Sequence, residues 1–174
     1  MIEIARPVMT LFHIANLCAF TCLGILVLLA AWIDWRQQII PNEISLGLLS
    51  CGLAYGVIVP HLTWSALIGG VAAGAGSLGA LAAIFRLCRG HEGLGIGDIK
   101  FSAAAGAWVG WEGLAPMLAL ASAMALIMIM SKRIYLGHDI TMSTRIPFGP
   151  YIGSALLIVW SVQASGIVFS PGLV

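Results

Sequence analysis

Residues 11–34 read LFHIANLCAFTCLGILVLLAAWID, a run of 23 residues without Asp, Glu, Lys or Arg that is closed by Asp34. At about 1.5 Å of rise per residue, a helix over 11–33 would be about 34 Å long, enough to cross a hydrocarbon core of about 30 Å. A cleaved signal peptide fits poorly, because the run is too long and Glu3 accompanies Arg6 before it. The run therefore predicts a membrane-spanning helix that ends in a carboxylate.

The composition of the whole chain supports this interpretation. Of its 174 residues, 60% are apolar and 9% are charged, against about 25% charged residues in a soluble globular domain. Ionisable groups close to hydrocarbon are costly, so each one is a candidate for function. The net charge of +1 does not favour nucleic-acid binding, which needs a basic surface. We expect one membrane-embedded domain over residues 1–174, in contact with the lipid bilayer.

The apolar pattern predicts an all-α, polytopic bundle of about six transmembrane helices. The fourth segment, residues 99–111, is short and is joined to the fifth, residues 114–130, through only Glu112 and Gly113. A tilted or partly interfacial helix is therefore the alternative for the fourth segment. The expected spans are Leu11–Ile33, Ile44–Val59, Trp64–Phe85, Ile99–Trp111, Leu114–Met130 and Pro150–Ala164.

The distribution of basic residues predicts the orientation. If the spans alternate in direction, the loops after the first, third and fifth spans share one side of the membrane. That side carries seven of the eight basic residues and the other side carries only Arg6. The positive-inside rule then places these loops in the cytoplasm and both termini outside. Asp34 and Asp98 face the same compartment in this arrangement. The seven basic residues are Arg36, Arg86, Arg89, Lys100, Lys132, Arg133 and Arg145.

Small residues recur at helical spacing in the third and fourth spans, as Gly70/Gly74 and Gly106/Gly110. Such faces let helix backbones approach closely. Two interpretations stay open, tight packing within one bundle and the contact face of a homodimer.

The sequence after Asp34 indicates a break between two helices. Pro41 lacks an N–H and disfavours helix at the residue before it, while Asn42 is a good N-cap for the next helix. Asp34 would then lie at the membrane surface beside the break. The alternative is a carboxylate that merely ends a helix or pairs with Arg36.

The second candidate, Asp98, ends a glycine-rich stretch with glycines at positions 90, 93, 95 and 97. Glycine allows positive φ and close backbone approach, and Asp98 would lie at the start of a helix, where the dipole favours an anion. Such a loop is suited to receiving an extended peptide. A simple glycine-rich turn with Asp98 as a helix cap is the alternative.

Together the two aspartates match what an aspartic dyad needs. One carboxylate takes a proton from water while the other, protonated, polarises a scissile carbonyl. Because like charges about 3 Å apart cannot both ionise easily, such a pair holds one proton. The sequence therefore predicts hydrolysis of a peptide without a metal or another cofactor.

Three motifs resemble those of the type IV prepilin peptidases, the GxGD-type membrane aspartyl proteases. They are Asp34 with Ile40-Pro41-Asn42, then Gly95-Ile96-Gly97-Asp98-Ile99-Lys100, then Pro147-Phe148-Gly149-Pro150. The resemblance implies that Asp34 and Asp98 are catalytic and that the substrate is a prepilin or pseudopilin of a pilus or secretion system. It also implies a bacterial inner-membrane protein that cuts basic leaders at the cytoplasmic face. The residues expected to bind substrate or shape the loops are Gly95, Gly97, Lys100, Pro41, Asn42, Pro147, Phe148, Gly149 and Pro150.

Larger members of that family add a cytoplasmic domain with paired CxxC motifs and also N-methylate the new amino terminus. This chain has no CxxC and resembles a compact form, so a bifunctional peptidase and methyltransferase is the alternative rather than the expectation. A small proton- or cation-coupled transporter is the second alternative, since intramembrane carboxylates also serve transport.

Overall fold

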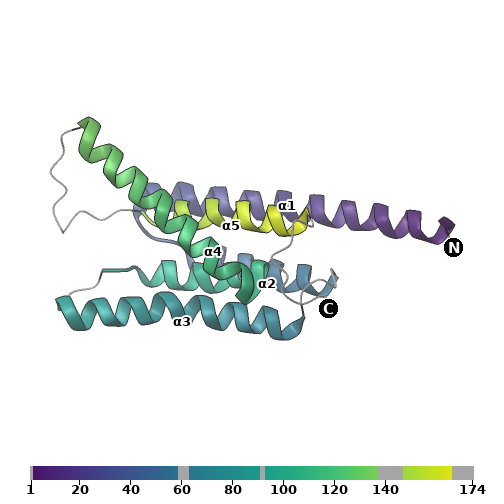
Figure 1. Cartoon of the computed structure of the whole chain (residues 1–174), viewed down its shortest axis with the longest axis horizontal. Helices are drawn as coiled ribbons and strands as arrows, with labels where there is room; N and C mark the ends of the chain where they lie inside the picture. Colours follow the sequence, from purple (N-terminus) through teal and green to yellow (C-terminus); the bar gives the residue numbers. More distant parts are fainter. Residues whose placement is uncertain (1, 59–62, 91–92, 137–146, 166–174) are drawn as a thin grey trace.

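The computed structural model describes residues 2–58, 63–90, 93–136 and 147–165, and the side chains of all of these except 2–13 and 135–136. The described residues form five helices and no strand, which confirms the all-α prediction (Figure 1). The helices are α1 (Ile2–Gln37), α2 (Asn42–Ile58), α3 (Trp64–Arg89), α4 (Ile96–Leu136) and α5 (Gly149–Ala164).

Three helical segments are long and apolar enough to cross a membrane, at Ile14–Gln37, Trp64–Arg89 and Ile96–Ile134. The apolar helix α2 is shorter, with 17 residues. Large apolar side chains such as Leu28 and Ile68 lie on the outer surface, 69% and 64% exposed. Contiguous apolar surface of this kind is unfavourable in water and suits contact with lipid. The chain is a membrane protein.

The expected count of six spans is not confirmed, because the fourth and fifth segments are joined in α4. Gly110 interrupts α4 with non-helical angles of φ 67° and ψ 178°, a conformation that is almost restricted to glycine. The chain bends sharply there, and the rest of α4 returns toward the end at which α4 begins (Figure 1). The break lies two residues before the expected one at Glu112. The first helix begins at Ile2, nine residues before the expected Leu11, and α4 ends at Leu136, six residues after the expected Met130. The other expected boundaries differ by at most four residues, and Val59 and Arg145 lie outside the described residues.

The side-chain amide of Gln163 in α5 supports the break in α4. Because Gly110 leaves the helical path, carbonyl groups of the preceding turn lose their partners within the helix. The Nε2 of Gln163 donates a hydrogen bond of 3.1 Å to the carbonyl oxygen of Val109. The bend is therefore tied to the end of α5.

An aromatic cluster joins four helices in the half of the bundle away from the two aspartates. Tyr55 stacks on Trp108 with ring centroids 5.6 Å apart, and Trp160 meets both rings edge-on. Phe20 of α1 stacks on Trp160. The indole N–H of Trp108 donates to the carbonyl oxygen of Leu48 at 2.8 Å, so its polar group is satisfied within the buried core.

Small residues bring α3 and α4 into direct backbone contact. A Cβ atom added to Gly70 would collide with the carbonyl oxygen of Gly106, and one added to Gly74 would collide with that of Ser102. The glycine pattern therefore serves packing within the chain, as the first of the two interpretations predicted. Gly110 serves the break in α4. The homodimer stays a prediction without this face to support it.

We expect Gly74→Ala to lower the free energy of unfolding by about 1–3 kcal/mol, because the new methyl group would force two backbones apart. Gly76→Ala in the same helix is the matched control, since nothing lies within 4 Å of an added Cβ there. Unfolding in mixed detergent micelles measures both variants. Equal stabilities would contradict the close packing of α3 on α4.

Candidate active site

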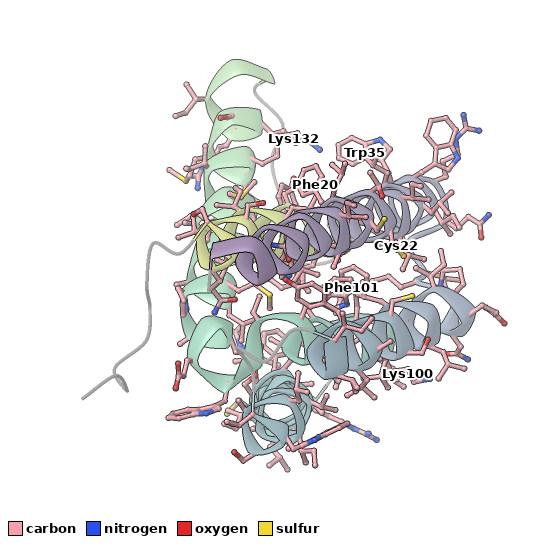
Figure 2. The ribbon with its side chains drawn as sticks, turned by 90° about the vertical axis from the view of Figure 1, so that its right-hand side faces the viewer. Phe20, Cys22, Trp35, Lys100, Phe101 and Lys132 are labelled. Carbon is pink, nitrogen blue, oxygen red and sulfur yellow. The ribbon has the colours of Figure 1, made fainter. Side chains whose placement is uncertain are left out.

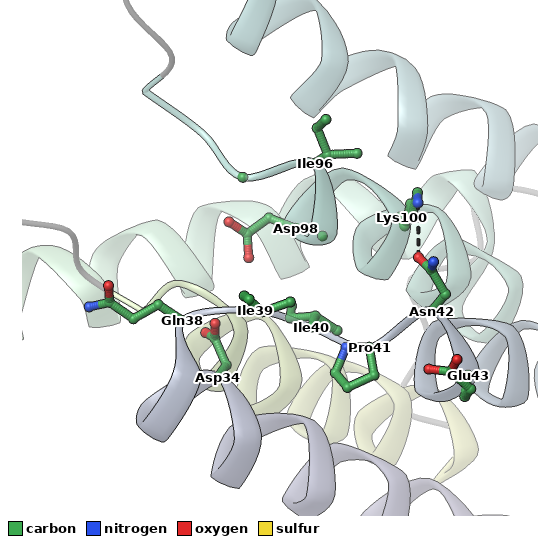
Figure 3. A pocket seen from close by; sticks show the side chains of 12 residues that line it. Asp34, Gln38, Ile39, Ile40, Pro41, Asn42, Glu43, Ile96, Asp98 and Lys100 are labelled. Carbon is green, nitrogen blue, oxygen red and sulfur yellow. Dashed lines mark hydrogen bonds between the residues drawn. The ribbon is translucent and has the colours of Figure 1, made fainter.

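The two aspartates line one cavity at the end of the bundle where α1 ends and α4 begins. The cavity has a volume of about 590 Å³ and lies between the loop after α1 and the first turn of α4 (Figure 3). Its lining residues are Asp34, Gln38, Ile39, Ile40, Pro41, Asn42, Glu43, Gly95, Ile96, Gly97, Asp98 and Lys100.

Asp34 lies in the last turn of α1 and is only 5% exposed. The backbone N–H of Gly149 donates a 2.9 Å hydrogen bond to its Oδ2 atom. Gly149 is the first residue of α5 and is followed by Pro150, so the positive end of this helix dipole also faces the carboxylate. A Cβ on Gly149 would lie 2.7 Å from the same Oδ2. Glycine is therefore required for this contact.

The loop that follows Asp34 turns the chain from α1 into α2. The N–H of Gln38 still donates to the carbonyl oxygen of Asp34, but Gln38 itself has a positive φ of 55°, which ends the helix. Pro41 precedes α2, which begins near the expected place but with Asn42 as its first helical residue rather than its N-cap, since the carbonyl oxygen of Pro41 accepts from the N–H of Ser45. Ile40 is buried within the core between these two points. The loop therefore forms one wall of the cavity, and the buried side chain of Ile40 holds it against the core.

Asp98 lies in the first turn of α4, and its N–H donates to the carbonyl oxygen of Gly95 at 3.1 Å. The glycines before it serve close approach rather than positive φ. A Cβ on Gly95 would lie 3.3 Å from Oδ2 of Asp98, and one on Gly97 would lie 3.3 Å from the backbone nitrogen of Ile40. Within this glycine-rich stretch, positive φ is found only at Gly90 among the described glycines, where it ends α3.

The carboxylates of Asp34 and Asp98 reach the cavity from two helices, α1 and α4, whose backbones lie apart. No Cα atoms of α1 and α4 lie within 8 Å of one another in the part of the chain that is described. Both side chains nevertheless line the same cavity, and Figure 3 shows Asp34 reaching it from the end of α1 and Asp98 from the first turn of α4. Repulsion between such neighbours opposes ionisation of both at once. A pair that holds one proton can act as acid and base together.

Lys100 lines the cavity beyond Asp98, but its side chain points away from that carboxylate. Its Nζ atom donates a hydrogen bond of 2.9 Å to Oδ1 of Asn42 (Figure 3). The bond joins the first turn of α4 to the first residue of α2. The amide of Asn42 is thus used to join two helices.

Seven of the residues expected at the site line the cavity: Asp34, Pro41, Asn42, Gly95, Gly97, Asp98 and Lys100. Of the last motif, Gly149 binds Asp34, Phe148 packs against the core, and Pro147 and Pro150 do not line the cavity. The remaining lining residues, which the sequence did not assign to the site, are Gln38, Ile39, Ile40, Glu43 and Ile96. Ile40 and Ile96 lie within the motifs and the other three lie beside them, which was the available signal. No group of three or more potential metal ligands occurs within the described residues.

Comparison with known proteins gives one consistent result. The chain matches the type IV leader peptidase family over residues 21–130, a range that includes both aspartates. It is similar to a protein of Dickeya chrysanthemi named prepilin leader peptidase/N-methyltransferase, with 38% identity over 140 residues, 80% of this chain and 48% of that protein. A protein of the same name from Aeromonas hydrophila is 34% identical over 147 residues, 83% of this chain and 50% of the relative.

A third protein of that name, from Klebsiella pneumoniae, is 40% identical over 100 residues, which cover 58% of this chain and 43% of the relative. The chain spans about half the length of these relatives. No solved structure matches it significantly.

We expect cysteines placed at Asp34 and Asp98 to be joined by a short bifunctional thiol reagent, because both side chains reach one cavity. The chain would carry serine at its four natural cysteines, and mass spectrometry of the linked peptides is the measurement. Asp34→Cys with Glu112→Cys is the control. The helical part of α4 before its break places residue 109 about 17 Å from residue 98, and position 112 follows directly after that break. Equal linking of both pairs would contradict the shared cavity.

Proposed function

The chain belongs to the type IV leader peptidase family, and we propose that it is a membrane aspartic endopeptidase that removes the leader of prepilins or pseudopilins. The observation that carries the proposal is the pair of carboxylates, Asp34 and Asp98, on one cavity at one end of an apolar bundle. We assign catalysis to these two residues. The other cavity residues shape the site or contact the peptide.

In the proposed reaction, water lies between the two carboxyl groups and the scissile peptide bond. The ionised carboxylate takes a proton from the water as its oxygen bonds to the carbonyl carbon. The protonated carboxyl group donates a hydrogen bond to the carbonyl oxygen and stabilises the charge that develops there. When the C–N bond breaks, the nitrogen receives the proton that the carboxylate took from water and leaves as the new amino terminus, and the carbonyl carbon keeps the oxygen of the water in a new carboxyl group. The N–H of Gly149 supports the negative charge of Asp34.

The substrate follows from the family and from the position of the cavity. A prepilin carries a short basic leader before an apolar helix, so its cleavage point lies at the membrane surface. Asp34 lies in the last turn of the apolar segment Ile14–Gln37, and Asp98 lies in the first turn of the apolar segment Ile96–Ile134. A pair of carboxylates at helix ends is therefore placed for a bond at the surface of the bilayer.

The relatives are named for a second activity, N-methyl transfer. The reaction argued from these carboxylates needs no methyl donor, and we propose the peptidase activity alone for this chain.

A proton- or cation-coupled transporter is the other class of function. Transport across a bilayer favours ionisable groups near the middle of the membrane. Asp34 and Asp98 instead lie in terminal turns of their helices, within one cavity. This position favours the peptidase.

We also propose a bacterial inner-membrane location, with the cavity at the cytoplasmic face and both termini outside. The excess of basic residues on the loops at this end supports that orientation.

The described helices share one core, which supports a single domain over residues 1–174. A homodimer is compatible with the exposed apolar surface, although no particular face favours it.

We expect Asp34→Asn and Asp98→Asn each to lower the rate of prepilin cleavage by about 10²–10⁴-fold, because each removes one partner of the proton transfer. A gel-shift assay with a co-expressed prepilin measures processing. Glu112→Gln makes the same chemical change at an exposed residue and should leave cleavage intact. Normal processing by either aspartate variant, at normal expression, would remove the dyad from the proposal.

We expect a cysteine at Arg89, in a cysteine-free chain, to react with membrane-impermeant reagents only from the cytoplasmic side. The basis is the cluster of basic residues at this end of the bundle. Labelling in right-side-out and inverted vesicles is the measurement. Reaction from the outer side would reverse the proposed orientation.

A further inference from the structure

Two contacts connect the first turn of α4 to the loop that follows Asp34. On one side of Asp98, Gly97 lies so close to Ile40 that a Cβ would be 3.2 Å from the Cβ of Ile40. On the other side, Lys100 donates its 2.9 Å hydrogen bond to Asn42. Asp98 thus lies between two residues, one in contact with the loop after α1 and the other bound to the first residue of α2.

These contacts matter because α1 and α4 have no direct backbone contact in the described residues. The position of Asp98 relative to Asp34 must therefore be transmitted through intermediate residues. The loop 38–41 is continuous with the last turn of α1, where Asp34 lies. It is the shortest covalent path from Asp34 to groups that touch the first turn of α4.

We propose that Lys100 and Asn42 form a positioning pair that sets the separation between the carboxylates of Asp34 and Asp98. The inference rests on the proposed peptidase function and assigns a role within its site. Lys100 is exposed and its ammonium group is bound to Asn42 on the side away from the Asp98 carboxylate (Figure 3). Its contribution is therefore a distance constraint between α2 and α4, and water screens its charge from the dyad.

Two other roles for Lys100 make different predictions. A lysine that reduces repulsion between the aspartates would act without Asn42, and its loss would change the pH dependence of cleavage. A lysine that only extends to the lipid headgroups could be replaced without effect. A positioning pair requires both members, and either loss should act on the catalytic step.

The test compares Lys100→Met, Asn42→Leu and the double variant in cleavage of a purified prepilin in detergent. Each single variant should lower kcat by about 10- to 100-fold, since a misplacement of about 1 Å can cost about 10²-fold. KM and the shape of the pH profile should stay the same. The double variant should be no slower than the slower single one, because both changes remove one contact. Lys100→Arg, which keeps a donor, should recover part of the lost rate.

Lys132→Met is the matched control, because Lys132 lies over the ring of Trp35 and outside the cavity. It should cleave at the normal rate. Thiol linking between Asp34→Cys and Asp98→Cys gives a second readout that needs no activity, and Lys100→Met should reduce its yield.

Additive losses, a shifted pH profile for Lys100→Met alone, or unchanged rates in both single variants would overturn the positioning pair. Unchanged thiol linking in the Lys100→Met chain would overturn it as well. Cleavage by Asp34→Asn or Asp98→Asn in the same assay would instead refute the proposed peptidase mechanism, so the two failures are distinguishable.

Discussion

The hydrogen bond from the Gly149 N–H to Asp34 is the contact on which the site depends. A carboxylate that is 5% exposed has lost most of its water, and a buried charge without a partner is strongly destabilising. The donor comes from a residue 115 positions later in the chain. It can reach Asp34 only if the first turn of α5 packs at the end of α1. This requirement explains why position 149 has no room for a side chain.

The rest of the bundle places Asp98 opposite this pair. α4 packs against α2, α3 and α5, and glycines on both sides of its contact with α3 allow the backbones to meet. The break at Gly110 then returns the chain toward the site end. There Lys132 lies over Trp35 of α1, with 5.8 Å between Nζ and the ring centroid (Figure 2).

The sequence predicted the features that depend on local chemistry. Pro41 and Asn42 marked the start of α2 within a few residues, and the basic loops placed Asp34 and Asp98 at one end of the bundle. The features that it did not predict depend on contacts between distant residues. The amide of Gln163 is 54 positions from the carbonyl of Val109 that it binds, and Lys100 is 58 positions from Asn42. Neither spacing has a local pattern, so the contact of Gln163 with the break in α4 and the role of Asn42 required the tertiary structure.

For a peptidase, a dyad formed by two directly packed helices would exclude its own substrate, because the peptide bond must enter between the carboxyl groups. Here the Cα atoms of Asp34 and Asp98 lie more than 8 Å apart, and a cavity of about 590 Å³ lies beside them. Their positions are fixed instead by groups at the flanks: Gly149 holds one carboxylate, and Ile40 and Asn42 hold the turn that carries the other. Catalysis needs groups that are fixed before the substrate arrives, and support from the flanks provides this without filling the space that the peptide must occupy.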